Sequence, residues 1–298
     1  MPCYHPIPAY QDKPGEEVRL WPPVGTANME IPCGGCLGCK CTKATEWARR
    51  AVHEAKTWKY NCFLTLTYNN EELPADGQLV PQDLQKFLKR LRRYRDRRHP
   101  ALDTERHLPL GLRYLASGEY GSSGGRPHYH LLLFNCAFND QYQVGADLYE
   151  SPLVNKTWEK GTHKLASLTG ASANYVAQYT VKKMGATHHN PDGVVIPAPF
   201  IRMSLKPAIG AQWLNEYKRD LTHGYLVTDG QKGRIPRAYT KRLAAGTRTD
   251  SLLAEEIVWR AAQAARGAPT GRDKKQQLQA MERIHAQKIA VNQQRRKL

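Results

Sequence analysis

The stretch Pro127-His128-Tyr129-His130-Leu131-Leu132-Leu133-Phe134 is rich in aromatic and aliphatic residues and predicts a β-strand over residues 128–134. The run Asn61-Cys62-Phe63-Leu64-Thr65-Leu66-Thr67-Tyr68 has a β-branched and aromatic character and predicts a second strand. A third strand is expected over residues 112–117, and the Gly-rich link at 121–125 joins it to the first as a hairpin would. The chain therefore centres on a sheet with at least one antiparallel pair.

Helical patterns alternate with these strands. Pro81 opens a helix with an apolar stripe at i, i+3, i+4 and i+7 and with cations on its other faces. The stripe consists of Leu84, Phe87, Leu88 and Leu91. Further helices are expected over about residues 42–57 and 173–184, and Gly185 suits the end of the second. The pattern predicts an α/β fold of the α+β sandwich type, with a central, mainly antiparallel sheet and helices packed on one face.

The remaining segments show little periodicity. Residues 1–32 are rich in Pro and Gly and predict an irregular arm, and residues 136–172 look like an insertion. From about Thr249 the sequence is helix-prone and basic, which predicts one or two exposed helices or a partly disordered tail. The expected organisation is an N-terminal arm with a Cys cluster, a central domain and a basic helical or partly disordered tail, over residues 1–45, 46–243 and 244–298, respectively.

The charge of the chain is strongly positive and clustered. Lys and Arg total 44 against 27 acidic residues, which gives a formal net charge of +17. Residues 86–98 hold eight cations and one acid, and residues 232–298 hold sixteen cations and five acids. Clustered cations are expected of a protein that binds a phosphate polymer, because each contact with a phosphate can release a condensed counterion. Nucleic acid is the favoured partner, and an anionic membrane surface is the weaker alternative.

Three features of the sequence predict that the protein works in a cytoplasm. No stretch approaches the ~20 uninterrupted apolar residues of a membrane span, and the first ten residues lack the pattern of a secretory signal. The seven cysteines are odd in number and tightly clustered, which argues against a secreted disulfide framework. Reduced thiols are therefore expected.

Four of these thiols are close together in the sequence. The Cys-x-x-Cys spacing predicts a structural Zn²⁺ site, with plain reduced cysteines as an equal alternative. The candidate ligands are Cys33, Cys36, Cys39 and Cys41. Four cysteines this close do not necessarily all reach one ion, so Cys3 or His5 could replace one of them.

A second candidate metal site follows from strand geometry. Side chains alternate faces along a strand, so His128 and His130 point the same way and can both reach one divalent ion. Glu119 ends the preceding strand, directly across the hairpin, and can bring a carboxylate to the same ion. Two His and one Glu leave open positions for water and phosphate, which suits Mg²⁺ or Mn²⁺ better than a closed zinc site. Each residue alone would more simply be an ordinary surface side chain.

Two tyrosines share a face of the predicted helix over residues 173–184. Tyr175 and Tyr179 are four residues apart, and Lys182 follows at i+3 from Tyr179. A phenol with a pKa of about 10 is a poor nucleophile at neutral pH. A neighbouring ammonium and a metal-polarised phosphate would both assist its attack. Aromatic packing is the alternative role for the pair.

In combination and in this order, the motifs resemble those of the HUH endonucleases, in which two His flank a bulky residue. The paired tyrosines resemble the two-nucleophile class of replication initiators. The chain looks most like the replication initiators of microviruses, in particular the gokushovirus branch, over about residues 30–243. Further stretches that carry the resemblance are Pro32-Cys33-Gly34-Gly35-Cys36-Leu37-Gly38-Cys39, Phe200-Ile201-Arg202-Met203-Ser204 through Pro207-Ala208-Ile209-Gly210, and Ile235-Pro236-Arg237-Ala238-Tyr239. Ala208 stands where the family pattern has glycine, which affects only a turn.

The resemblance implies a ferredoxin/RRM-like HUH endonuclease core at 46–243, followed by a basic helical extension. His128 and His130 would hold the metal, with Glu119 as the third ligand. One tyrosine would attack the scissile phosphate and leave a 5′-phosphotyrosyl link and a free 3′-OH. The second tyrosine would cleave after one circuit, and strand transfer would release a closed circle.

In this scheme Lys182 would stabilise charge or orient the phosphate. The Tyr-x-x-Lys spacing slightly favours Tyr179 as the initiating nucleophile, although the two tyrosines could alternate. The implied partners are single-stranded origin DNA, a host DNA polymerase and a helicase, in the cytoplasm of a host bacterium.

Two other functions compete with this hypothesis. A plasmid relaxase or transposase would use the same chemistry. A non-catalytic protein could coat single-stranded nucleic acid through cations and aromatic side chains. A covalent protein–DNA adduct separates the enzymes from the binding protein.

Overall fold

A computed structural model of the chain describes residues 3–13, 16–105, 111–121, 125–182, 188–190, 192–228, 230–264 and 274–295. Side chains are described in these ranges except at residues 179–182, 262–264 and 292–295. The chain divides into two compact units. Unit 1 comprises Met1–Lys43 and Ala262–Leu298, and unit 2 comprises Ala44–Ala261.

The main sheet belongs to unit 2. Among the described residues it has seven antiparallel strands in the order β14-β6-β7-β4-β11-β10-β9. The strands are β4 (Asn61–Tyr68), β6 (Arg113–Tyr120), β7 (Pro127–Phe134), β9 (Tyr142–Gly145), β10 (Leu148–Glu150), β11 (Gly161–Ala166) and β14 (Phe200–Met203). All three predicted strands are confirmed, as is the α+β fold with a mainly antiparallel sheet.

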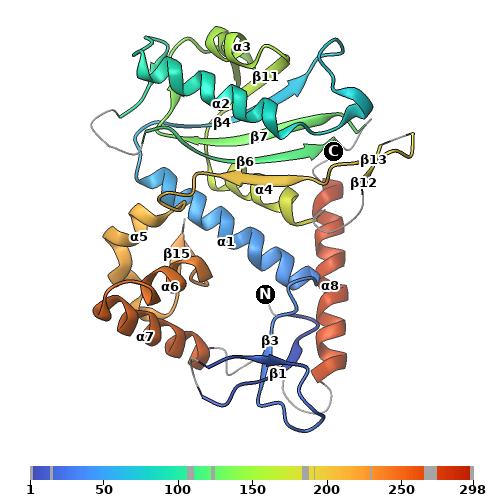
Figure 1. The fold of residues 1–298 in the computed structure, drawn as a ribbon, viewed down its shortest axis with the longest axis vertical. Coiled ribbons are helices and arrows are strands. Elements are labelled where there is room, and N and C mark those ends of the chain that lie inside the picture. The colour runs from blue at the N-terminus through green and yellow to red at the C-terminus, as the bar shows by residue number, and fades with distance from the viewer. Residues whose placement is uncertain are drawn as a thin grey trace. The chain divides into compact units, whose positions relative to one another are not determined.

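Helices cover both faces of this sheet (Figure 1). Helices α2 (Pro81–Asp96) and α3 (Pro152–Trp158) pack on one face, and α1 (Leu37–Lys56) and α4 (Gly170–Lys182) pack on the other. The prediction of helices on one face is therefore wrong. The reason is visible in β7, where residues 131–134 are all buried, as in strands that are covered on both sides.

The predicted insertion at 136–172 is also wrong, because this segment completes the sheet. It contains β8 (Ala137–Phe138), β9, β10, α3 and β11, and β11 pairs with β4 from Gly161↔Tyr68 to Ala166↔Phe63. These elements are short, and the inward positions of β11 are only His163 and Leu165. So brief an alternation gives a weak periodic signal.

The end of unit 2 has its own core. The buried side chains are Leu214, Leu221, Leu226, Tyr239, Leu243, Ala254 and Ile257. They come from α5 (Ala211–Tyr217), η2 (Lys218–His223), β15 (Leu226–Thr228), α6 (Arg237–Ala244) and α7 (Arg248–Ala264), and β15 pairs with β16 (Gln231–Gly233). The predicted C-terminal helices are present, but α7 is partly buried because Ala254 and Ile257 face this core. The short elements η1 (Ala75–Gly77), β5 (Leu102–Asp103), β12 (His188–His189) and β13 (Val195–Ile196) lie in the connections.

Unit 1 joins the two ends of the chain. Strands β1 (Ile7–Tyr10), β2 (Arg19–Leu20) and β3 (Met29–Ile31) form a small antiparallel sheet, so the prediction of a wholly irregular arm is wrong. Strands of two to four residues are too short to show periodicity. Helix α8 (Lys274–Arg295) belongs to the same unit, a grouping that the sequence did not predict. The domain boundaries at 45 and 243 stay predictions. None of the described helices is long and apolar enough to cross a membrane.

Candidate functional site

The β6–β7 hairpin brings the predicted carboxylate and imidazoles together. Glu119 is the direct cross-strand partner of His128, and Ser117 is the partner of His130. Because side chains alternate along each strand, all three candidate ligands lie on the face that α4 covers. One ligand atom from each of Glu119, His128 and His130 lies within 4.8 Å of the others.

His130 is held on several sides. Its Nε2 lies 2.5 Å from Glu119 Oε1, and its Nδ1 lies 2.9 Å from Thr65 Oγ1 on β4. The Phe63 ring stacks on the imidazole with 5.8 Å between centroids. His130 and Glu119 are 6% and 3% exposed, so their hydrogen bonds face little competition from water.

The donor set fits a divalent cation. Within the described part of the chain, the buried Glu119 Oε2 has no hydrogen-bond partner, which is costly for a carboxylate oxygen that faces no cation. If the Nδ1–H of His130 donates to Thr65, its Nε2 keeps a lone pair for a ligand. Two cis ligands on Mg²⁺ lie about 3 Å apart, given bonds of about 2.1 Å, so His130 and Glu119 need only a small separation to admit the ion.

Gly121 gives the His128 ring its space. A Cβ atom at this position would lie 2.9 Å from His128 Cε1 and 3.1 Å from its Nε2. The Gly121 N–H also donates to the Arg126 carbonyl at 2.9 Å and helps to close the hairpin. Sequence reasoning missed the roles of Gly121 and Thr65. The available signal for Thr65 was its position two residues from Phe63, on the same face of the strand.

Helix α4 places a phenol at this site. The Tyr175 ring stands edge-on to His130, with 5.1 Å between centroids and 88° between planes, and it also meets the edge of Phe63. The helix is anchored beside the sheet by its buried side chains, Ala173, Val176 and Ala177. Tyr179 and Lys182 follow on α4, but their side chains lie outside the described residues.

The tyrosine between the two histidines has a different environment. Tyr129 points to the opposite face of the sheet, where its hydroxyl lies 2.8 Å from Tyr68 Oη and accepts the Val80 N–H at 2.9 Å. Burial raises the pKa of Tyr129 to about 12. Tyr129 is therefore a core residue, remote from the face on which His128 and His130 lie.

Helix α2 carries most of the cations at 86–98. It covers the face of the sheet opposite to that of His128 and His130 (Figure 1). Arg90 illustrates their local use, since it donates from Nε to the Thr157 carbonyl at 2.7 Å and links α2 to α3. These cations do not line the site around His130.

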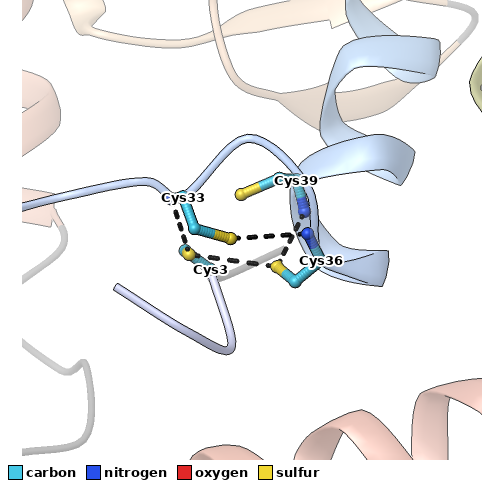
Figure 2. Close-up of side chains that lie close together, drawn as sticks. All are labelled: Cys3, Cys33, Cys36 and Cys39. Atoms are coloured by element: carbon cyan, nitrogen blue, oxygen red, sulfur yellow. Dashed lines mark hydrogen bonds between the residues drawn. The ribbon is translucent and has the colours of Figure 1, made fainter. Parts of the chain in front are cut away.

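A second group of candidate ligands lies in unit 1 (Figure 2). The Sγ atoms of Cys3, Cys33, Cys36 and Cys39 all lie within 4.8 Å of one another. Cys41, the fourth ligand predicted from spacing, is not in this group. Residues advance by about 100° on a helix, so Cys39 and Cys41 on α1 point about 160° apart. Cys3 takes the fourth place instead.

Comparison with known proteins gives consistent matches. The family described as replication-associated protein ORF2/G2P matches residues 61–184, from the start of β4 to just beyond α4. Replication-associated protein VP4 of Bdellovibrio phage phiMH2K is 36% identical over a match of 249 residues that covers 80% of this chain and 76% of the phage protein. Replication-associated protein ORF2 of Spiroplasma virus 4 is 32% identical over 270 residues, covering 82% and 80%.

A third relative, replication-associated protein ORF4 of Chlamydia phage 1, is 30% identical over a match of 222 residues that covers 71% of this chain and 53% of the relative. No solved structure matches the chain. The residues matched by the family description include the hairpin with Glu119, His128 and His130 and the helix with Tyr175.

Proposed function

We propose an activity from one premise: the chain belongs to the microvirus-like family of phage replication-associated proteins, and its role lies in phage replication. The proposed activity is to nick single-stranded DNA at the phage origin and to rejoin it after one round of rolling-circle synthesis. The observation that carries the proposal is the contact between the Tyr175 ring and His130, because it sets a nucleophile-bearing helix beside a cluster of possible metal ligands.

Glu119, His128 and His130 would hold Mg²⁺ or Mn²⁺. Such an ion, when bound, withdraws charge from the scissile phosphate and makes its phosphorus a better electrophile. The protein's own part is orientation. Thr65 and Phe63 fix the His130 ring, and the pairing of Glu119 with His128 fixes the carboxylate.

The covalent step uses a tyrosine oxygen as the nucleophile. The phenol gives its proton to solvent, its oxygen forms a bond to phosphorus, and the bond from phosphorus to the 3′ oxygen breaks. The 3′ oxygen takes up a proton and becomes the 3′-OH that a host polymerase extends, while the protein keeps the 5′-phosphate. We assign initiation to Tyr179 and the later cleavage to Tyr175, and the two can exchange roles in successive rounds. Lys182 would balance charge on the reacting phosphate or phenolate.

Two tyrosines explain how a circle can be released. While one tyrosine holds the 5′ end, the second can cleave the regenerated origin, and the new 3′-OH can attack the first phosphotyrosyl bond. The number of phosphodiester bonds is conserved, so the circle closes without another energy source. The reaction would take place in the host bacterial cell, with its DNA polymerase and a helicase as partners.

The test is an SDS-resistant adduct between the full chain and labelled single-stranded oligonucleotides that tile the phage genome. Adduct should form with Mg²⁺ or Mn²⁺ and disappear with EDTA. The double variant Tyr175→Phe plus Tyr179→Phe should form none, whereas Tyr142→Phe, an exposed tyrosine at 47%, serves as the matched control. Adduct formation by the double variant would contradict the proposal.

A non-catalytic single-stranded nucleic-acid-binding protein is the second candidate, because the net charge of +17 favours binding to any phosphate polymer. It would shift oligonucleotides in native gels and form no adduct under any metal condition. A plasmid relaxase or transposase has the same chemistry but does not fit membership of a phage replication family.

A further inference from the structure

The four sulfurs in unit 1 have the spacing of ligands around one ion (Figure 2). Cys36 Sγ lies 3.9 Å from Cys3 Sγ. Thiolates at the corners of a tetrahedral zinc site lie about 3.8 Å apart, because the Zn–S bond is about 2.3 Å. A disulfide would instead bring the two sulfurs to about 2.05 Å.

Backbone N–H groups point at the same sulfurs. The N–H of Tyr4 donates to Cys36 Sγ at 3.3 Å, and the N–H of Cys33 donates to Cys3 Sγ at 3.2 Å. The N–H groups of Cys36 and Cys39 donate to the sulfurs three residues earlier, at 3.4 and 3.5 Å. Such donors offset negative charge on thiolates and orient them, as partners of metal ligands generally do.

The turn between Cys33 and Cys36 is shaped for this arrangement. Gly34 has a φ of +76°, a conformation that residues with a Cβ rarely adopt. The turn brings Cys33 back toward the start of α1, where Cys36 directly precedes the helix and Cys39 lies in its first turn. Cys3 reaches the same point from the other end of the β1–β3 segment.

A bound ion would also stabilise unit 1, which contains none of the hydrophobic clusters formed by the described residues. The three hydrophobic clusters formed by the described residues all lie within residues 44–257, in unit 2. Polar contacts join α8 to the N-terminal residues of unit 1, such as Tyr4 Oη to His285 Nδ1 at 2.9 Å and His5 Nε2 to Glu282 Oε2 at 2.7 Å. Small units without a large apolar core commonly depend on a metal or on disulfides.

We propose that Cys3, Cys33, Cys36 and Cys39 bind one structural Zn²⁺, which fastens the N-terminal arm to the start of α1. Four thiolates fill the coordination sphere and leave no position for substrate, so the ion is structural. A four-iron cluster would spread its thiolates over four metal atoms and hold the sulfurs farther apart than the edge of a single-ion tetrahedron. The proposal is independent of the proposed nicking activity, which depends on residues of unit 2.

The first experiment measures metal in the purified full chain by inductively coupled plasma mass spectrometry. One zinc per chain is expected. In Cys39→Ser the zinc retained after dialysis should fall about tenfold or more, while Cys41→Ser, two residues further on α1, should keep it. Absence of zinc, iron in its place, or equal losses in the two variants would overturn the proposal.

A second measurement on the unmodified sequence guards against misfolded variants. Cobalt added to the chelator-stripped chain should give visible ligand-field bands and near-ultraviolet thiolate-to-cobalt bands, and one equivalent of Zn²⁺ should remove both. Hydrogen exchange should show lost amide protection at 3–13, 16–43 and 274–295 after chelation, with β4, β6 and β7 still protected. Failure to form the cobalt bands, or uniform loss of protection, would refute the site.

Discussion

Replacing Thr65 by Val tests whether the hydroxyl orients His130. The substitution preserves the shape of the side chain but removes the oxygen that lies 2.9 Å from His130 Nδ1. A lost partner of a metal-ligating His typically costs 10–100-fold in metal affinity. Phe63 and Tyr175 still hold the imidazole ring, so we expect the lower end, about tenfold or about 1.4 kcal/mol.

The assay is a Mn²⁺ titration followed by electron paramagnetic resonance, in parallel with adduct formation. The variant should need about tenfold more Mn²⁺ for half-maximal adduct and should recover near-normal adduct at saturation. Thr67→Val is the matched control, because Thr67 lies on the same strand and face, opposite His128. An unchanged Mn²⁺ midpoint in Thr65→Val, or an equal shift in Thr67→Val, would refute the assigned role of Thr65.

Three further outcomes are expected. Gly121→Ala should weaken Mn²⁺ binding, because the added Cβ would lie 2.9 Å from the His128 ring. Gly145→Ala is the control, since its Cβ would have its nearest contact at 3.7 Å and should leave Mn²⁺ binding unchanged. Equal Mn²⁺ midpoints for the two variants in calorimetry would contradict the steric argument. Burial lowers the pKa of His53 from 6.5 to about 3, so His53 stabilises the fold above pH 6.5 and this contribution is lost as the pH falls toward 3. Urea denaturation should show that the free energy of unfolding falls by about 2 kcal/mol between pH 6.5 and 5, and that His53→Gln lacks this fall. Parallel pH profiles for the two proteins would contradict the assigned role of His53. Tyr129→Phe should lower the free energy of unfolding by about 1–3 kcal/mol, because it removes the hydrogen bonds to Tyr68 and Val80. The variant should still form adduct at low temperature. Loss of adduct by a folded variant would indicate a chemical role for Tyr129.

Local patterns in the sequence were sufficient to predict the centre of the molecule. Alternation along a strand and a Gly-rich hairpin determine which side chains are neighbours, so the sequence alone groups Glu119, His128 and His130. The apolar run at 131–134 is also typical of a strand that is covered on both faces, a signal that contradicts the prediction of helices on one face. Strand β11 could not be predicted, because its alternation of buried and exposed residues includes only two buried positions.

Long-range features were harder to predict. The Cys group draws its fourth member from Cys3, thirty residues before Cys33. The sequence offered Cys3 only as an alternative beside His5, because spacing does not determine which distant segment returns to a helix end. Proximity in the chain favours Cys41 as the fourth ligand, but helical geometry turns its side chain away from the other three sulfurs. The roles of Tyr179 and Lys182 stay predictions, since their side chains are outside the described residues.

The alternation along β7 couples the orientation of the proposed metal ligands to the packing of the core. His128 and His130 share the strand with Tyr129 and Leu131, which point into the opposite layer. A slip of one residue would turn the imidazoles toward the layer under α2 and turn Tyr129 and Leu131 toward α4. A molecule with a shifted strand would thus be poorly packed and would also lack the proposed metal site, so the metal bound per mole of protein would report the fraction of molecules with the correct register.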